Sequence, residues 1–338
     1  EEKKLSGKDL ITALVAGYEI GTRIGIASKL RMSMHPHGVW GTVAAAVGLG
    51  KLLDYDQAAM KELISVSASM TTATNRQTML DGGTVRNIYS GMSSHNGLLA
   101  HYMIQSGFTG EKDGLNTVFS SVVSEEFNQE AMIKDLGNYF EIGRNYFKRY
   151  ACCRYNHSAL DATMEITGSL PDGRLDPDAI EKIDVWTYSL AAQLCGQEPD
   201  NMLAAKFSIP FAIATYLIHG NAGVSSFRMS AVQNPIIRDL SKKVTIFEDP
   251  KLTAMMPSKR PSRVLITLKN GDKLESEAFI NKGDTEDPYT QEELKEKYHE
   301  LVDPVFGNAT AENIYEKLMD LDKAKDISEI IKQMIPIN

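Results

Sequence analysis

The spacing of apolar residues changes near residue 147, and this change constrains the fold more than any other feature of the 338-residue chain. Before that point, apolar residues recur with the period of a helix, which predicts consecutive helices. After it, short runs alternate apolar and polar residues, which predicts β-strands. A chain of this length exceeds one comfortable hydrophobic core, so we expect two domains of different composition.

Capping residues mark where the helices of the first part begin. Ser6 with Asp9 three residues later is typical of a capping box. A second helix is predicted after His35-Pro36-His37, and a third is predicted to be capped by Asp56 or Asp54. Further helices are predicted near Ser94–Ser106 and Glu125–Leu136.

The second part combines a few helices with a small sheet. Helices are predicted over Ser158–Thr167 and Ile209–Ile218, and strands around Ile183–Thr187, Val244–Ile246 and Val264–Leu268. Asn270-Gly271 follows the third strand and predicts a hairpin with a return strand through Leu274 to Phe279. This order indicates an α+β layer with a mostly antiparallel sheet. From Thr290 the helical spacing returns, at Leu294–Leu301 and Ile314–Leu321.

Charge and cysteine content exclude several classes of protein. The net charge of −8 argues against nucleic acid as a partner, and residues 284–338 carry 14 acidic and 6 basic side chains, as expected of a solvated helical surface. Three cysteines cannot build a disulfide framework, which fits a reducing compartment. No export signal or long apolar run supports membrane insertion, so we expect a cytoplasmic protein.

His35 and His37 lie in the loop that opens the second predicted helix. An imidazole can act as a base near neutral pH, and a helix N-terminus favours an anion beside it, so this motif suits proton abstraction. The structural alternative is that one histidine caps the helix while the other is solvated. Metal binding would need further ligands besides these two residues.

Arg86 follows the glycine pair Gly82-Gly83 and precedes an apparent helix. Its guanidinium would bind a substrate carboxylate through a two-pronged contact if it points inward, and otherwise it reaches solvent. His95 and His101, on the same apparent helix, are interpreted as structural.

The stretch Phe147–Asp161 surrounds two adjacent cysteines with four basic residues: Lys148, Arg149, Arg154 and His157. Cations in a partly buried stretch need anionic partners, which indicates a carboxylate-binding pocket. Lys148 and Arg149 either lie on opposite sides of the backbone or together clamp a ligand. Cys152 and Cys153 are interpreted as structural thiols, because no second catalytic group is specified for them.

Nucleotide, dinucleotide, serine-hydrolase and zinc-protease motifs are missing from the sequence. Acid/base chemistry without a cofactor is the class that remains.

Five segments, in this order along the chain, together resemble the MmgE/PrpD family: HPHG at 35–38, GGTVRNIYSG at 82–91, FKRYACCRYNHSALDA at 147–162, AAKFSIPFAIA at 204–214 and RVLITLKNGD at 263–272. The family contains 2-methylcitrate dehydratase, cis-aconitate decarboxylase and iminodisuccinate epimerase. The resemblance implies a mainly α fold with a large all-helical domain over 1–146 and 284–338. A smaller inserted α+β lid domain over 147–283 and a substrate cleft between the two domains are also implied, as are a homodimer and the absence of metal and organic cofactors.

The resemblance also assigns residues. The pocket histidine of the family falls on His35, the lysine at the edge of the lid on Lys148, and the histidine after the CCRY sequence on His157. Where many relatives carry a lysine and a histidine, this chain has Arg86 and Tyr89, so carboxylate binding is retained there while a proton-donating lysine is lost. Members begin with a helical portion bearing an Asp-Asp-Thr-His-like motif, and this chain starts downstream of it. We therefore expect either a fragment or a complementary chain that supplies this portion.

These residues together predict a lyase of the 2-methylcitrate dehydratase type acting on a small di- or tricarboxylic acid. His35 is the predicted base, Lys148, Arg86 and Arg154 hold carboxylates, and His157 or Tyr89 supplies a proton. An epimerase, an isomerase or a decarboxylase of a similar acid is the enzymatic alternative. A subunit that is active only with a partner chain is the alternative from another class.

Overall fold

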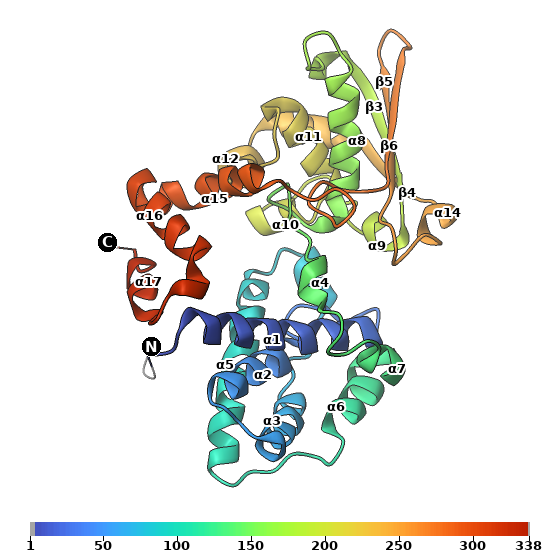
Figure 1. The fold of residues 1–338 in the computed structure, drawn as a ribbon. Helices are drawn as coiled ribbons and strands as arrows, with labels where there is room; N and C mark the ends of the chain where they lie inside the picture. The colour runs from blue at the N-terminus through green and yellow to red at the C-terminus, as the bar shows by residue number, and fades with distance from the viewer. Residues whose placement is uncertain (1–3, 337–338) are drawn as a thin grey trace. The chain divides into compact units, whose positions relative to one another are not determined.

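A computed structural model describes residues 4–336 and divides the chain into two compact units. The helical unit consists of the described parts of Glu1–Arg76, Asn87–Asn145 and Thr290–Asn338 (Figure 1). The α+β unit consists of Gln77–Arg86 and Tyr146–Tyr289. The predicted fold class, mainly α with a smaller α+β part, is confirmed by these elements.

The helical unit is built around α1, α2, α3 and α5. Ser6 and Asp9 form the predicted capping box of α1, and Asp56 caps α3. Helix α1 packs on α2, which in turn packs on α3 and α5. A Cβ atom on Gly17 of α1 would lie 2.7 Å from the Ala44 carbonyl oxygen of α2, so this glycine permits the close approach of the two helices. The helices and strands of the unit are α1 (Gly7–Ala27), β1 (Ser28–Leu30), α2 (Gly41–Leu52), α3 (Gln57–Ser69), α5 (Tyr89–Gln105), α6 (Gly114–Thr117), β2 (Ser124–Phe127), α7 (Gln129–Ile133), α15 (Gln291–Phe306), α16 (Asn308–Met319) and α17 (Ser328–Gln333).

The helix predicted over Glu125–Leu136 is wrong. Strand β2 occupies the first part of this segment and pairs antiparallel with β1, with Ser28 opposite Phe127. Helix α7 begins only after Asn128, whose side chain caps it. Pairing with a strand about a hundred residues away overrides the local helical pattern, and it also means that this unit is not purely helical.

Helix α1 is long and apolar enough to cross a membrane by length and composition alone. Core helices of globular proteins pass the same test. Glu19 and Arg23 of α1 are both buried and form an ion pair of 2.5 Å. Arg23 also donates to the Met132 and Lys134 carbonyl oxygens, so the helix anchors the segment that follows β2.

The sheet of the α+β unit has the order β4-β3-β5-β6. β3 pairs parallel with β4 and antiparallel with β5, and β5 pairs antiparallel with β6 across the predicted Asn270-Gly271 turn. Helix α8 packs on β5 and β6, and α11 contacts β4 (Figure 1). The strands of this sheet are β3 (Ile180–Thr187), β4 (Val244–Glu248), β5 (Ser262–Leu268) and β6 (Lys273–Ala278). The helices are α8 (His157–Gly168), α9 (Ser189–Ala192), α10 (Met202–Lys206), α11 (Ile209–His219), α12 (Met229–Val232), α13 (Pro235–Lys242) and α14 (Pro250–Thr253); α4 (Arg76–Leu80) begins at the last residue of the preceding helical segment.

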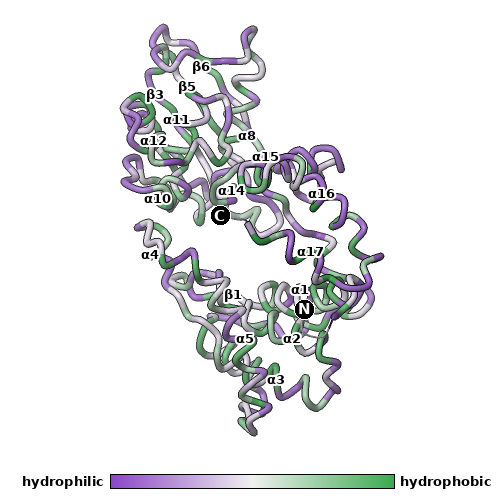
Figure 2. The backbone as a smooth tube through the Cα atoms, turned by 90° about the vertical axis from the view of Figure 1, so that its left-hand side faces the viewer, coloured by the Kyte–Doolittle hydropathy of each residue, from purple (hydrophilic) through white to green (hydrophobic). Residues whose placement is uncertain are grey.

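The acidic C-terminal segment forms surface helices, as its composition predicts. Helix α15 has no buried residue. Figure 2 shows α16 as largely hydrophilic. Its buried residues are Ala311 and Ile314.

Candidate functional site

His157 is the first residue of α8, and its side chain is fully buried in the α+β unit. The Tyr146 hydroxyl lies 2.5 Å from Nδ1 of His157, and the Tyr150 ring meets the imidazole edge-on at 5.1 Å between centroids. Burial raises the pKa of Tyr146 well above its usual value, so the phenol keeps its proton. The phenol donates to Nδ1 when the neutral imidazole carries its proton on Nε2, and it accepts when the proton is on Nδ1, so the contact restrains the His157 ring in either tautomer.

Arg154 lies over the ring of Tyr146, with its guanidinium carbon 3.8 Å from the ring centroid. Its Nη2 forms an ion pair with Asp284. Burial and the charge of Arg260 lower the pKa of Arg154, while the charge of Asp284 raises it. A guanidinium nevertheless remains charged in proteins, so this site holds a permanent cation one ring away from the buried imidazole.

A second hydrogen-bond network fixes α8 against the loop after β6. Asp161 of α8 accepts from the Tyr150 hydroxyl at 2.8 Å and from Nδ2 of Asn281 at 2.7 Å. Burial raises the pKa of Asp161, and these two bonds act in the opposite direction. The loop that carries Asp284 is thereby tied to the helix that carries His157.

The other charged residues of this stretch have different neighbours. Lys148 is exposed, and its charge opposes the rise in the pKa of Cys152 that burial causes, whereas Arg149 lies 5.6 Å from the Tyr150 ring centroid. Burial dominates at Cys152 and raises its pKa strongly. A thiol that holds its proton so firmly is a poor nucleophile, which agrees with the structural interpretation of this cysteine. Cys153 is half-buried.

Arg86 is half-buried in the 3₁₀-helix Thr84–Ile88 of the chain. Its guanidinium carbon lies 5.4 Å from the Phe207 ring centroid within the α+β unit. The side chain is therefore packed against an aromatic face rather than extended into solvent, which removes the solvent-directed alternative.

His35 is 3% exposed in the helical unit. Its backbone N–H donates to the Thr74 carbonyl oxygen at 2.8 Å, and its ring centroid lies 4.5 Å from that of His37 and 6.0 Å from that of Tyr89. Tyr89, the first residue of α5, is also buried. The structure thus brings together the predicted base and one of the two predicted proton donors.

Neither histidine is the N-cap residue of α2. The N-cap is Trp40, which makes no side-chain capping bond, and Gly38, between His37 and Trp40, adopts a φ of +88°. A Cβ atom on Gly38 would lie 3.1 Å from the Tyr89 carbonyl oxygen, so this glycine allows the loop to approach α5. His37 is exposed. Across residues 4–336, no group of three His, Cys, Asp or Glu side chains has the arrangement of a metal site.

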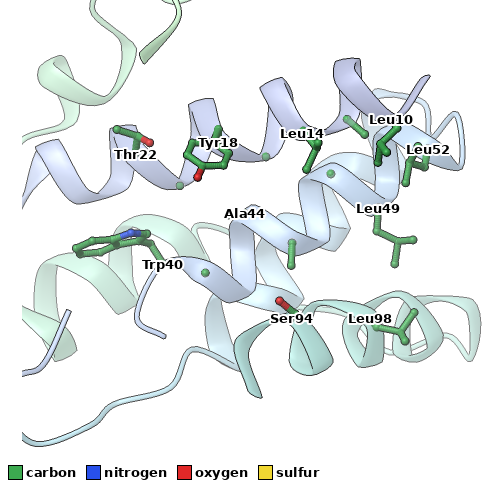
Figure 3. A pocket seen from close by; sticks show the side chains of 16 residues that line it. Leu10, Leu14, Tyr18, Thr22, Trp40, Ala44, Leu49, Leu52, Ser94 and Leu98 are labelled. Carbon is green, nitrogen blue, oxygen red and sulfur yellow. The ribbon is translucent and has the colours of Figure 1, made fainter. Parts of the chain in front are cut away.

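A large groove of about 580 Å³ in the helical unit lies between α1, α2 and α5 (Figure 3). Leucines, alanines and glycines form most of its wall, with Tyr18, Thr22, Trp40 and Ser94 as the side chains that carry a polar atom. It contains no charged residue and none of the predicted site residues. An anionic metabolite would lose its hydration there without gaining a counter-ion, so this groove does not suit one.

Four residues of these arrangements were not singled out from the sequence: Tyr146, Arg260, Asn281 and Asp284. Tyr146 immediately precedes the basic stretch, so its position was the one available signal for it. Asp284 lies 130 positions from Arg154, and no local pattern connects the two.

Comparisons with known proteins match almost the whole chain. The family model of the MmgE/PrpD C-terminal domain matches residues 150–322, and that of the MmgE/PrpD N-terminal domain matches residues 1–128. A cis-aconitate decarboxylase of Aspergillus terreus is 24% identical over 351 residues, which cover 98% of this chain and 71% of the relative. The cis-aconitate decarboxylase of Mus musculus is 25% identical over 350 residues (97% and 69%), and that of Homo sapiens is 23% identical over 344 residues (96% and 68%).

Proposed function

This chain belongs to the MmgE/PrpD family, and from that membership we propose that it is a lyase acting on a small di- or tricarboxylic acid. The proposed chemistry forms a carbanion next to a carboxylate and needs two things from the protein. One is an imidazole that exchanges a proton with carbon, and the other is a set of cations that hold the carboxylates and stabilise the charge that develops on their oxygens.

The part-buried hydrogen bond between Tyr146 and His157, with Arg154 over the Tyr146 ring, carries the proposal. A buried imidazole held by a tyrosine hydroxyl, near a permanent cation, is an arrangement suited to proton transfer near a bound carboxylate. A purely structural histidine would not need a neighbouring arginine for its packing.

We assign the following roles. His35 is the base, and Lys148, Arg86 and Arg154 bind carboxylates. His157 or Tyr89 returns a proton. Burial of His35 beside Tyr89 supports the pairing of base and donor in the helical unit. Arginine at position 86 binds a carboxylate through parallel hydrogen bonds but keeps its own proton, so the acid must be another residue.

Among lyase reactions, decarboxylation of an acid like cis-aconitate is the first to test, because the relatives are named for it. Dehydration of the 2-methylcitrate type is the second. Both reactions pass through charge on the carbon next to a carboxylate, so the same cations and imidazoles serve either one.

A panel of citrate-like, aconitate-like and aspartate-like acids tests the proposal in deuterated water. A decarboxylase releases CO₂ and a dehydratase forms an alkene. An epimerase forms an isomer of the substrate in which one hydrogen is replaced by deuterium. We expect His35→Ala to lower kcat at least about a hundredfold on the acid that reacts. His95→Ala is the matched control, since His95 is exposed on α5. Full activity of His35→Ala would refute His35 as the base, and no turnover of any acid would refute the lyase.

We also propose a cytoplasmic homodimer that turns over substrate, on the strength of the family resemblance. Sedimentation equilibrium and turnover by the purified chain test this. A monomer refutes the dimer, and turnover that appears only after addition of a complementary helical chain would favour a partner-dependent subunit.

A further inference from the structure

We infer that Arg154, Lys259 and Arg260 form a subsite for one carboxylate group of the ligand, and that Asp284 occupies this subsite when no ligand is bound. The inference rests on the proposed function, because it assumes that the natural ligand is a polycarboxylate. It adds two cations and one competing acid to the site residues already proposed.

Three cations from two segments line one small hollow of the α+β unit. Arg154 comes from the segment before α8, and Lys259 and Arg260 come from the segment before β5. The Arg260 backbone is fixed because its carbonyl oxygen accepts a hydrogen bond from the Ser158 hydroxyl of α8. The charge of Arg260 acts on Arg154 directly. Like charges held this close repel each other unless an anion lies between them.

The loop after β6 supplies that anion from within the chain. Asp284 pairs with Nη2 of Arg154, while Glu286 lines the same hollow and bonds to Thr285. With the Asp284 side chain in place, the remaining space is about 10 Å³, about the size of one water molecule. The hollow is therefore sized for a single carboxylate, and the protein's own carboxylate fills it.

The subsite is still short of partners for its cations. Nε of Arg154 is buried and has no hydrogen-bond acceptor among the described residues. Three cations face two acids, of which only Asp284 forms an ion pair with Arg154. A ligand carboxylate that replaced Asp284 could contact both Nε and Nη2 of Arg154, which is the two-pronged geometry that guanidinium groups favour.

The subsite is connected to the buried imidazole of His157 through Tyr146. Arg154 lies on the Tyr146 ring, and the Tyr146 hydroxyl is bonded to His157. A carboxylate held by Arg154 would therefore place the rest of the ligand beside the group that we assign to proton transfer. Asp284 sets the affinity for such ligands, because each must displace it.

Binding of tricarballylate, a stable tricarboxylate, to the full-length chain tests the inference by calorimetry at low ionic strength. We expect Asp284→Asn to tighten binding at least about fivefold, and Arg260→Gln to weaken it by a similar factor. Asp239→Asn is the control: it removes one negative charge from exposed α13, and we expect its binding to stay within about twofold.

Unchanged or weaker binding in a folded Asp284→Asn variant overturns the competition, and equal tightening in Asp239→Asn overturns its assignment to Asp284. If Asp284→Asn fails to fold, Arg260→Gln decides alone, and unchanged affinity there refutes the subsite. Turnover of an acid by the wild-type chain together with unaltered binding in both variants would refute the subsite and leave the lyase standing. If the variants show the expected binding pattern but the wild-type chain turns over no acid, the subsite stands and the lyase is refuted.

Discussion

The hydroxyl of Tyr146 and Nδ1 of His157 are 2.5 Å apart in the α+β unit. Burial keeps the phenol protonated, and its hydrogen bond restrains the orientation of the imidazole. We therefore treat the tyrosine as a positioning residue that acts on the ligand only through the ring of His157.

Replacing Tyr146 with phenylalanine should therefore affect chemistry more than binding. Without the hydroxyl, Nδ1 of His157 loses this hydrogen bond and the ring loses one restraint. We expect kcat to fall about tenfold or more and its pH dependence to change, while KM changes less. Steady-state kinetics from pH 5 to 9 measure both. Tyr102→Phe on the exposed face of α5 is the control, and an unchanged pH profile in Tyr146→Phe would contradict the assignment.

Gly283 holds the Asp284 loop against the segment that contains Tyr146. Its φ is +93°, and a Cβ atom would lie 2.0 Å from the Phe147 carbonyl oxygen. Phe147 N–H donates to the Gly283 carbonyl oxygen at 2.9 Å, so the two segments cannot separate without losing this bond. We expect Gly283→Ala to lower the free energy of unfolding by about 2 to 4 kcal/mol in urea titrations.

Gly271 offers a matched control for this substitution. It has a φ of +90° at the hairpin turn and nothing within 4 Å of a Cβ atom. Gly271→Ala therefore reports backbone strain alone, about 1 kcal/mol. Equal losses in the two variants would mean that the contact with Phe147 does not matter.

The buried pair of Glu19 and Arg23 should be costly to break. The side chains are 5% and 2% exposed, and Arg23 also binds carbonyl oxygens of the segment after β2. Arg23→Ala leaves a buried carboxylate without its cation, so we expect a loss of about 3 to 5 kcal/mol in the free energy of unfolding. Lys323→Ala breaks a surface pair with Asp320 and should cost less than about 1 kcal/mol. Similar costs for the two would refute the buried role.

The sequence correctly predicted those structural elements that depend on residues close together in the chain. The Asn270-Gly271 hairpin, the capping box at Ser6 and helix α8 follow from residues within a few positions of one another, and the structure has all three. The helix predicted over Glu125–Leu136 failed because a distant strand, β1, recruits its first residues.

The site divides in the same way. His35, Arg154 and His157 were recognisable as chemical groups from their motifs. Their partners were not, because a hydrogen bond or ion pair such as Arg154 with Asp284 depends on how the chain returns after 130 residues. Sequence identifies the reactive side chains, whereas their protonation and orientation come from tertiary contacts.

His299 joins α15 to α16, and this junction should weaken in acid. Its Nδ1 lies 2.8 Å from Asp303 on α15, and its Nε2 lies 2.9 Å from Glu312 on α16. The bond from His299 lowers the pKa of Asp303, and the bond from Lys295, followed by that from His299, lowers the pKa of Glu312.

Carboxyl groups whose folded pKa lies below the unfolded value add stability at higher pH and lose it as the pH falls through the folded pKa. The ordinary values are 3.8 and 4.5, so the stability gap between wild type and His299→Ala should shrink from pH 5 to pH 3 in urea titrations. The gap for exposed His95→Ala should stay constant, and a gap for His299→Ala that widens toward pH 3 would show that the carboxylates are not what holds the two helices together.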